Sequence, residues 1–387
     1  MKKKVLISIL VLLLLVGTNL FTALSLTYGR SGVEEESIKI KYLEDFVKKY
    51  YLYDVDEDDF EVGKLKGVVA SLNDPYSEYY TKEEYKKLME FTTGKFYGIG
   101  VIITKGEDNL ITVISPIKDS PAYKAGIQAQ DKIIKVNGKE FTADSLTEAT
   151  EIMKGERGTE VDITIYRPST GKTKDLKIKR DEISIETVIS KKIDDIGYIG
   201  ITSFDEKTAD EFNTQLDNLL KQNIKSLIID LRGNPGGIVD TAAEVCDRIL
   251  PEGKIVYALD KNKNKVFEFD SDPQKLDLPI AVLINEGSAS ASEIVAGAIR
   301  DYKAGTIIGK KSFGKGIVQT AKQFPTGDGI KLTTSEYFTP NGENIHKKGI
   351  KPDIEVDLPE DIKGIGYEYL DTDLQLQKAI EILKGES

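Results

Sequence analysis

The sequence predicts an α/β fold for its second half, preceded by a small β-rich domain and an N-terminal helical segment. Two apolar runs, 226–231 and 280–284, show no polar alternation, which is typical of parallel strands covered on both faces. Between residues 96 and 180, short runs alternate apolar and polar side chains, as strands with one exposed face do. Residues 34–88 repeat apolar side chains at helical spacing among many charges, which indicates amphipathic helices. The patterns divide the chain into four predicted parts: 1–29, 30–90, 91–180 and 181–387.

Composition narrows the class of protein. The 387 residues are 40% hydrophobic and 30% charged, which is ordinary for a globular chain with more than one core. The net charge of -11 argues against nucleic acid as a partner, because phosphate binding needs a basic surface. The single cysteine, Cys246, excludes an intrachain disulfide and multi-cysteine metal sites, and its apolar neighbours predict a buried thiol.

The first part of the chain predicts export. Three lysines precede the apolar run 5–26, which is long enough to cross a bilayer with its start in the cytoplasm. Residues 1–29 are therefore a signal peptide or a membrane anchor. The length of the run and the absence of a clean small-residue cleavage site favour an uncleaved, single-pass anchor over a secreted product. Either way, the rest of the chain is expected to be extracytoplasmic.

Residues 30–90 are expected to be helical. Tyr42, Phe46 and Tyr50 recur at helical spacing, and such an apolar stripe must be buried against the rest of the chain or against a second copy. A homodimer is therefore an expected assembly. The turn 73–77 ends the helical pattern.

Residues 91–180 are expected to form a small β domain. Asn137-Gly138 is a tight-turn pair, and a short helix at 121–125 is opened by Pro121 and closed by Gly126. Residues 120–138 follow the pattern SPAxxAGIxxxDxIxxVNG, in which the chain resembles a PDZ domain. Strands are expected at 98–103, 110–114, 131–136 and 161–166.

The resemblance to a PDZ domain implies a peptide-binding groove. Its carboxylate-binding loop matches Gly98, Ile99, Gly100 and Val101, and the helix 145–154 would form the facing wall. Such a groove captures a peptide's free C-terminus on backbone N–H groups and the edge of a strand. The alternative is that the two glycines only shape a β-bulge.

A cluster of serines follows the second apolar strand. Ser288, Ser290 and Ser292 lie between that strand and a helix expected at 291–299, where a helix N-terminus favours developing negative charge. Spacing alone does not choose among them. Ser290 and Glu293 also fit a capping box, in which the serine hydroxyl only satisfies a helix amide, unless Ser288 takes that role.

The base for such a serine is not expected to be a histidine, because the chain has one, His346, in a lysine-rich loop predicted to be exposed. Lysine is the alternative when burial lowers its pKa. Lys315 lies between Gly314 and Gly316, and glycines in such positions often let the backbone pass close to another segment. Its apolar neighbours Phe313, Ile317 and Val318 are candidates to desolvate it.

The second half resembles the C-terminal processing peptidases, also called tail-specific proteases. Four segments carry this resemblance, and it implies a crotonase/ClpP-like protease core in which Ser290 is the nucleophile, Lys315 the general base and Gln319 a supporting polar residue. The oxyanion donors would be the N–H groups of Gly236 and Ala291. Arg232 and Asp301 also match and are interpreted as structural anchors. The four segments are 230–237, 287–294, 309–319, and 339–342 with 349–353.

The function expected from these features is a serine endopeptidase that needs no metal or cofactor. It would recognise the free, apolar C-terminus of extracytoplasmic protein substrates through its PDZ domain. Arg167, at the end of the last PDZ-like strand, is a candidate contact between that domain and the core. Two alternatives remain: a catalytically silent PDZ adaptor, and an acyl-CoA enzyme on a related fold, since fold does not fix function.

Overall fold

The computed structural model describes residues 35–93, 96–183, 185–359 and 361–385. They belong to two compact units, one ending at Asn73 and one beginning at Asp74. The predicted signal or anchor segment lies outside the described residues. In the part of the chain that is described, no helix is both long enough and apolar enough to span a bilayer.

The described part of the first unit is helical, as predicted, but the predicted helical part 30–90 also contains a strand, β1 (Glu78–Tyr80), which belongs to the second unit. A helix over residues 35–50 is followed by α2 (Glu57–Ala70). Ion pairs join the two, Lys48 to Glu57 at 2.5 Å and Lys64 to Glu44 at 2.8 Å. The predicted aromatic stripe is exposed on the first helix, where the ring of Phe46 lies 6.4 Å from that of Tyr42 and 4.7 Å from that of Tyr50.

A five-stranded antiparallel sheet forms the centre of the small β domain, with a sixth short strand paired to β5. The run predicted as one strand at 98–103 is broken at Ile99 and Gly100, so that its first part pairs with the strand that leaves the domain. Arg167 binds Asp131 and the carbonyl oxygen of Gly126 within the same domain, and its role as a contact to the core stays a prediction. The elements are β2 (Phe96–Gly98), β3 (Val101–Lys105), β4 (Ile111–Pro116), α4 (Pro121–Lys124), β5 (Lys132–Val136), β6 (Lys139–Glu140), a 3₁₀ turn (Ala143–Ser145), α5 (Leu146–Met153), β7 (Glu160–Arg167), β8 (Lys172–Lys179) and β9 (Asp181–Ile183).

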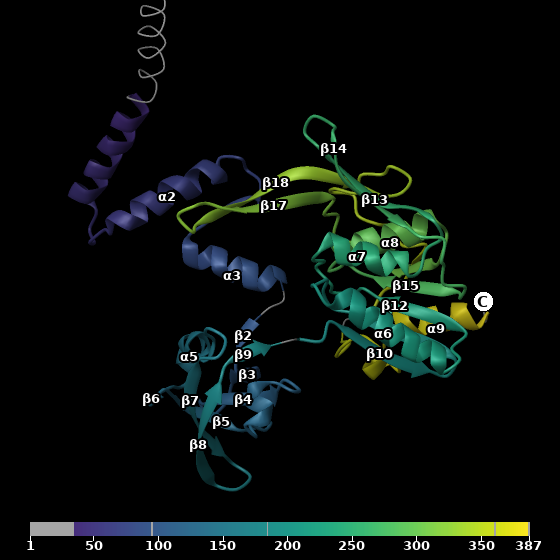
Figure 1. The fold of residues 1–387 in the computed structure, drawn as a ribbon, viewed down its shortest axis with the longest axis horizontal. Coiled ribbons are helices and arrows are strands. Elements are labelled where there is room, and N and C mark those ends of the chain that lie inside the picture. The colour runs from purple at the N-terminus through teal and green to yellow at the C-terminus, as the bar shows by residue number, and fades with distance from the viewer. Residues whose placement is uncertain (1–34, 94–95, 184, 360, 386–387) are drawn as a thin grey trace, which may run out of the picture. The chain divides into compact units, whose positions relative to one another are not determined.

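The α/β core is built on a six-stranded sheet, in the order β10-β11-β12-β15-β16-β19. From β11 to β19 the strands are parallel, and β10 is an antiparallel edge. Helices α6, α7 and α8 cover one face and α9 covers the other (Figure 1). The elements are β10 (Val188–Ile193), β11 (Ile196–Ile201), α6 (Thr208–Lys221), β12 (Ser226–Asp230), α7 (Val239–Asp247), β15 (Ile280–Ile284), α8 (Ala291–Asp301), β16 (Thr306–Gly309), β19 (Ile354–Glu355), a 3₁₀ turn (Tyr367–Tyr369) and α9 (Leu374–Lys384).

The two-sided cover explains the apolar runs in the sequence. Leu227 and Ile229 of β12 pack into the cluster under α6, α7 and α8, whereas Ile228 between them packs with Leu376 of α9. Successive side chains of a strand point to opposite faces. Every residue of β12 and β15 is therefore buried, and no polar alternation can arise.

A second sheet, in the order β1-β18-β13-β14 with β17 paired to β18, lies beside the core. Strand β1 follows the turn 73–77 and pairs with β18, which attaches the start of the second unit to this sheet. Strand β17 begins two residues after Lys315. The elements are β1 (Glu78–Tyr80), α3 (Lys82–Thr93), β13 (Gly253–Asp260), β14 (Lys265–Ser271), β17 (Ile317–Gln323) and β18 (Gly329–Phe338).

Candidate active site

Ser290 lies in a strained turn between strand β15 and helix α8. Its backbone has φ 54° and ψ -112°, a conformation that costs about 1–3 kcal/mol for a residue with a side chain. Strain of this kind concentrates at functional sites, and a sharp strand-to-helix turn is how some hydrolases expose a nucleophilic serine. The conformation sets Ser290 apart from its neighbours.

The three serines of the turn differ in what their hydroxyls do. Ser288 donates to the carbonyl oxygen of Leu231 at 2.7 Å, and Ser292 donates to that of Asn234 at 3.0 Å. Both serines are fully buried. Ser290 is 9% exposed. Its oxygen belongs to a capping box with the backbone N–H of Glu293, and its hydroxyl donates to no other residue in the described part of the chain. Ser288 does not cap the helix, so that alternative is wrong.

The carboxylate of Glu293 joins the turn of Ser290 to the loop of Lys315. Its Oε2 accepts the N–H groups of Ser290 at 2.9 Å and Lys315 at 2.8 Å. Its Oε1 accepts the hydroxyl of Ser312 at 2.6 Å and the N–H of Gly314 at 2.7 Å. With four donors on two oxygens, this fully buried carboxylate is compensated for the loss of water. Sequence analysis assigned Glu293 only to a cap.

A second bridge joins the same two segments from the other side. The hydroxyl of Tyr337 on β18 lies 2.7 Å from the carbonyl oxygen of Lys315 and 3.1 Å from that of Ser290. Burial, and then the charge of Glu293, raises the pKa of Tyr337 well above its usual value. The phenol therefore stays protonated and donates to these carbonyls.

The amine of Lys315 is positioned to lose its charge. Burial, and then the nearby charge of Lys331, lowers the pKa of Lys315, while Glu293 acts in the opposite direction. The ring of Tyr76 lies beside the amine, with its centroid 5.3 Å from Nζ. In the described structure, Lys315 Nζ and Ser290 Oγ are not hydrogen bonded to each other; such bonds often tighten only when substrate binds.

The glycines around Lys315 allow close packing, as predicted. A Cβ on Gly316 would lie 2.5 Å from the backbone nitrogen of His346, and one on Gly314 would lie 2.9 Å from that of Gly349. Of the predicted desolvating neighbours, Ile317 is buried but Phe313 is 57% exposed. Tyr76, which sequence analysis missed, lies where that cover was expected.

Gln319 lies on strand β17 rather than on a helical turn. Its Nε2 donates to Thr333 Oγ1 at 3.3 Å on the neighbouring strand β18, and its backbone follows a register shift at Val318. Within the described structure its side chain makes no hydrogen bond to Lys315. Gln319 thus lies in the sheet two residues after β17 begins, four residues after Lys315.

The two predicted oxyanion donors lie next to Ser290. A Cβ on Gly236 would be 2.8 Å from Ser290 Cβ and 2.9 Å from the nitrogen of Ala291, so the three backbones are in contact. The N–H of Ala291 has no partner among the described residues. The N–H of Gly236 donates to Asn234 Oδ1 at 2.8 Å and must be shared or released to bind an oxyanion.

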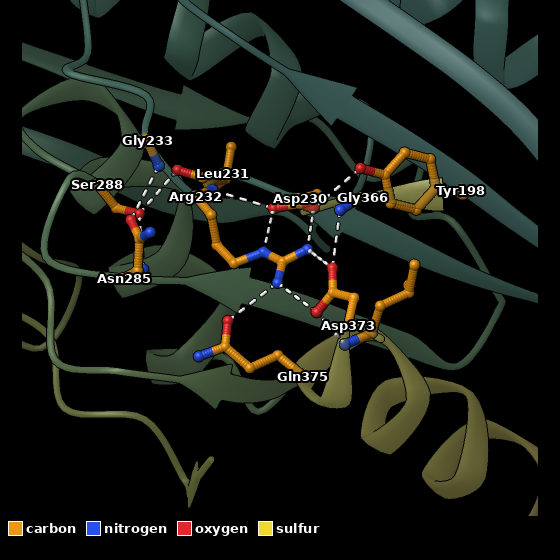
Figure 2. A network of polar contacts seen from close by, with 11 residues as sticks. Tyr198, Asp230, Leu231, Arg232, Gly233, Asn285, Ser288, Gly366, Asp373 and Gln375 are labelled. Atoms are coloured by element: carbon orange, nitrogen blue, oxygen red, sulfur yellow. Dashed lines mark hydrogen bonds and ion pairs between the residues drawn. The ribbon is translucent and has the colours of Figure 1, made fainter. Parts of the chain in front are cut away.

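Arg232 anchors the loop that carries Gly236 (Figure 2). Its guanidinium makes two-pronged contacts with Asp230 and Asp373, and a fifth hydrogen bond goes to Gln375 Oε1 at 2.9 Å. All five N–H donors are therefore used. Tyr198 donates to Asp230 at 2.9 Å. The predicted structural role of Arg232 is confirmed: Asp230 at the end of β12 is one partner, and the N-cap and first turn of α9 supply the other two.

The remaining sequence predictions have clear outcomes. Asp301 accepts from Thr339 Oγ1 at 2.6 Å and from the N–H of Asn341 at 3.0 Å, which confirms it as an anchor. Cys246 is fully buried, as predicted.

His346 is half-buried and its Nδ1 has no partner among the described residues, so the prediction that His346 is exposed is wrong. The described residues contain no cluster of His, Cys, Asp and Glu that could hold a metal ion.

A narrow apolar groove lies in the small β domain. It has a volume of about 160 Å³, and its wall includes all four residues predicted for the carboxylate loop, together with Ile103 and helix α5. A Cβ on Gly100, whose φ is +73°, would lie 2.4 Å from Ser120 Cβ. The glycine is thus required by packing as well as by conformation.

Comparison with known proteins agrees with these features. Family models match for peptidase family S41 over residues 195–356, a PDZ domain over 112–167, and the activating protease CtpB N-terminal domain over 24–84. The chain is 42% identical over 329 residues to the carboxy-terminal processing protease CtpA of Bacillus subtilis, which covers 84% of this chain and 70% of that protein. It is 38% identical over 354 residues to a probable CtpA-like serine protease of Staphylococcus epidermidis, covering 89% and 71%.

Among solved structures, the photosystem II D1 C-terminal processing protease is similar, with a TM-score of 0.51 and 28% identity over 84% of this chain and 89% of that one. Its likeness extends to the mixed α/β core. Together, the α/β core, the PDZ domain and the identity to carboxy-terminal processing proteases show that the chain is a serine peptidase of family S41, in the group of C-terminal processing proteases.

Proposed function

We propose that Ser290 and Lys315 form the catalytic dyad of this peptidase. One observation carries the proposal. Of the three serines at the turn, Ser290 alone donates its hydroxyl to no other described residue, and its backbone is strained. The carboxylate of Glu293 accepts the backbone N–H of Ser290 and that of Lys315, the lysine whose pKa is lowered. A neutral amine is a competent base for a serine hydroxyl.

The proposed reaction uses groups of this chain alone. Ser290 Oγ bonds to the scissile carbonyl carbon while its proton moves to Lys315 Nζ, and the carbonyl electron pair moves to the oxygen. That oxygen is held by the N–H of Ala291 and by the N–H of Gly236 once Asn234 releases it. The lysine ammonium then gives its proton to the departing amine, and water hydrolyses the acyl-enzyme with Lys315 again acting as base. Gln319 supports the base from strand β17.

The proposed substrates are proteins with a free, apolar C-terminus. The groove of the PDZ domain is lined by apolar side chains at Ile99, Val101 and Ile103, which suits an apolar last residue, and its glycine loop suits a carboxylate. We place the enzyme outside the cytoplasm, either anchored through residues 5–26 or secreted, because of the charge and length of that segment. The exposed stripe of Tyr42, Phe46 and Tyr50 is the proposed contact of a homodimer.

The dyad is tested with the full chain in detergent and an unfolded protein substrate. Ser290→Ala and Lys315→Ala are each expected to lower kcat/KM by about a thousandfold or more, since groups that act as a unit fail together. Lys311→Ala is the matched control, because Lys311 lies in the same loop and is exposed. A serine-directed phosphonate should label Ser290 alone. Retained cleavage in either dyad variant would refute the assignment, and a wild-type chain that binds tails without cleaving would favour the adaptor.

A further inference from the structure

An aromatic ring lies against the proposed base. The ring centroid of Tyr76 is 5.3 Å from Lys315 Nζ, within the distance at which a ring attracts a cation. Tyr76 is half-buried and belongs to the turn 73–77, which sequence analysis treated only as the end of a helical pattern.

Hydrogen bonds fix this turn in place. Asp74 accepts the N–H of Tyr76 at 3.0 Å and the hydroxyl of Ser77 at 2.6 Å. Ser77 Oγ in turn accepts the N–H of Thr333 on β18 at 3.0 Å. Thr333 also contacts Gln319, the residue beside the base. The turn that carries the ring is therefore attached to strand β18, the strand whose Thr333 contacts Gln319.

We propose that Tyr76 is a catalytic residue whose ring receives the ammonium formed on Lys315 when the Ser290 proton reaches Nζ. The inference rests on the proposed dyad. At an amine whose pKa is lowered by burial, the negative face of an aromatic ring replaces part of the hydration that an ammonium needs. A ring accepts no proton, so it stabilises the charged intermediate without competing for the proton of the nucleophile.

Other charged groups act on the same amine. Lys331 on β18 disfavours the ammonium of Lys315, and Glu293 on α8 favours it. Asp74 of the turn and His346 of the facing loop are the other titratable groups here, and they lie close enough to interact with each other. All four stay unchanged when the ring is altered, so variants of Tyr76 isolate its contribution.

The test compares Tyr76→Phe with Tyr76→Leu in the full chain, measuring kcat and the pH dependence of kcat/KM. Phenylalanine keeps the ring, so both quantities should match the wild type. Leucine keeps the site apolar but removes the ring, so kcat should fall about tenfold. The acid limb should move to lower pH, because an ammonium that has neither ring nor water loses its proton more readily.

Tyr76→Ala should shift the pH profile in the opposite direction from Tyr76→Leu. The alanine variant admits water to the amine, so the acid limb of kcat/KM should move to higher pH while kcat falls. If a thermal melt shows that Tyr76→Leu does not fold, the phenylalanine and alanine variants decide the outcome: Tyr76→Phe should match the wild type, and Tyr76→Ala should lower kcat and shift the acid limb. Tyr257→Leu is the matched control, because Lys254 lies 4.7 Å from the ring centroid of Tyr257, and it should leave the pH profile unchanged.

Two results separate the failure of this inference from the failure of the dyad. If Lys315→Ala is inactive but Tyr76→Leu and Tyr76→Ala keep the wild-type kcat and acid limb, the role of Tyr76 is refuted and the dyad stands. If Lys315→Ala remains active, the base is wrongly assigned and the inference falls with it. A fall in kcat with an unmoved acid limb in both variants would reduce Tyr76 to a structural residue.

Discussion

Two features of the structure require glycine at position 236: a positive φ and the lack of space for a Cβ. The φ of Gly236 is +99°, and a Cβ would lie 2.6 Å from the carbonyl oxygen of Ala289 and 2.8 Å from Ser290 Cβ. Gly233, in the same loop, has φ +69° but open space around its Cβ position. Comparing variants of the two glycines therefore distinguishes the effect of backbone strain from the effect of a steric clash with Ser290.

We predict that Gly236→Ala lowers kcat by about a hundredfold or more, the scale of losing one oxyanion donor. Gly233→Ala should keep most activity and cost about 1–2 kcal/mol of stability for its left-handed backbone. Peptidase assays and denaturant unfolding of both variants measure these effects. Equal activity in the two variants would mean that the backbone of Gly236 has no role beside Ser290.

Sequence analysis identified some of these residues and missed others for a physical reason. Ser290 and Glu293 are three residues apart, so their capping pair is visible in the sequence. The other bonds of Glu293, to Ser312, Gly314 and Lys315, join it to a distant segment and leave no spacing signal. One clue was available: Glu293 is the only charged residue in the first nine positions of α8, where an uncompensated charge would be costly.

Among the elements, helix α9 is held to the core by a buried charge rather than by apolar packing alone. Burial by itself would raise the pKa of Asp373, but the hydrogen bonds and charge of Arg232, with the N–H groups of Gly366 and Leu376, lower it. Asp373 is also the N-cap of α9. A carboxyl whose pKa is lowered on folding stabilises the protein above its unfolded pKa, and this contribution is lost as pH falls through the folded value.

Asp373→Asn should therefore destabilise the protein at pH 7 by about 3 kcal/mol, since it leaves Arg232 and Asp230 with an incomplete buried network. The difference from the wild type should shrink below about pH 4, where the carboxyl of the unfolded chain takes up a proton, and should be lost as pH falls through the lower pKa of the folded state. Denaturant unfolding across this pH range measures it. Asp371→Asn, an exposed neighbour, should change little, and an unchanged midpoint for Asp373→Asn at pH 7 would contradict the prediction.

The elements themselves were largely predictable. Buried parallel strands show no polar alternation, so β12 and β15 lie within one residue of the predicted runs 226–231 and 280–284, and α8 begins at the predicted Ala291. The run 98–103 was predicted as one strand, but the chain turns at Gly100, whose positive φ ends one strand and begins another. Alternation alone does not reveal which partner a strand takes.

At the scale of the whole molecule, the chain combines a catalytic core with a separate PDZ domain, each with its own apolar cluster. Binding at one site and chemistry at the other are then carried by different residues. If the groove binds C-terminal tails as proposed, a change confined to it should alter KM for tailed substrates without altering the chemistry proposed for Ser290 and Lys315.

Thr150→Glu places a negative charge in the wall of the groove, on helix α5. It should raise KM about tenfold for a protein with an apolar C-terminal tail, because a substrate carboxylate is repelled and the apolar wall is disrupted. Its kcat for that protein, and kcat/KM for a short amidated peptide that has no free tail, should stay at wild-type values. Thr147→Glu, exposed on the same helix and outside the groove, controls for the added charge. An equal loss on both substrates would show that the groove supports catalysis itself, and an unchanged KM would show that C-terminal tails are recognised elsewhere.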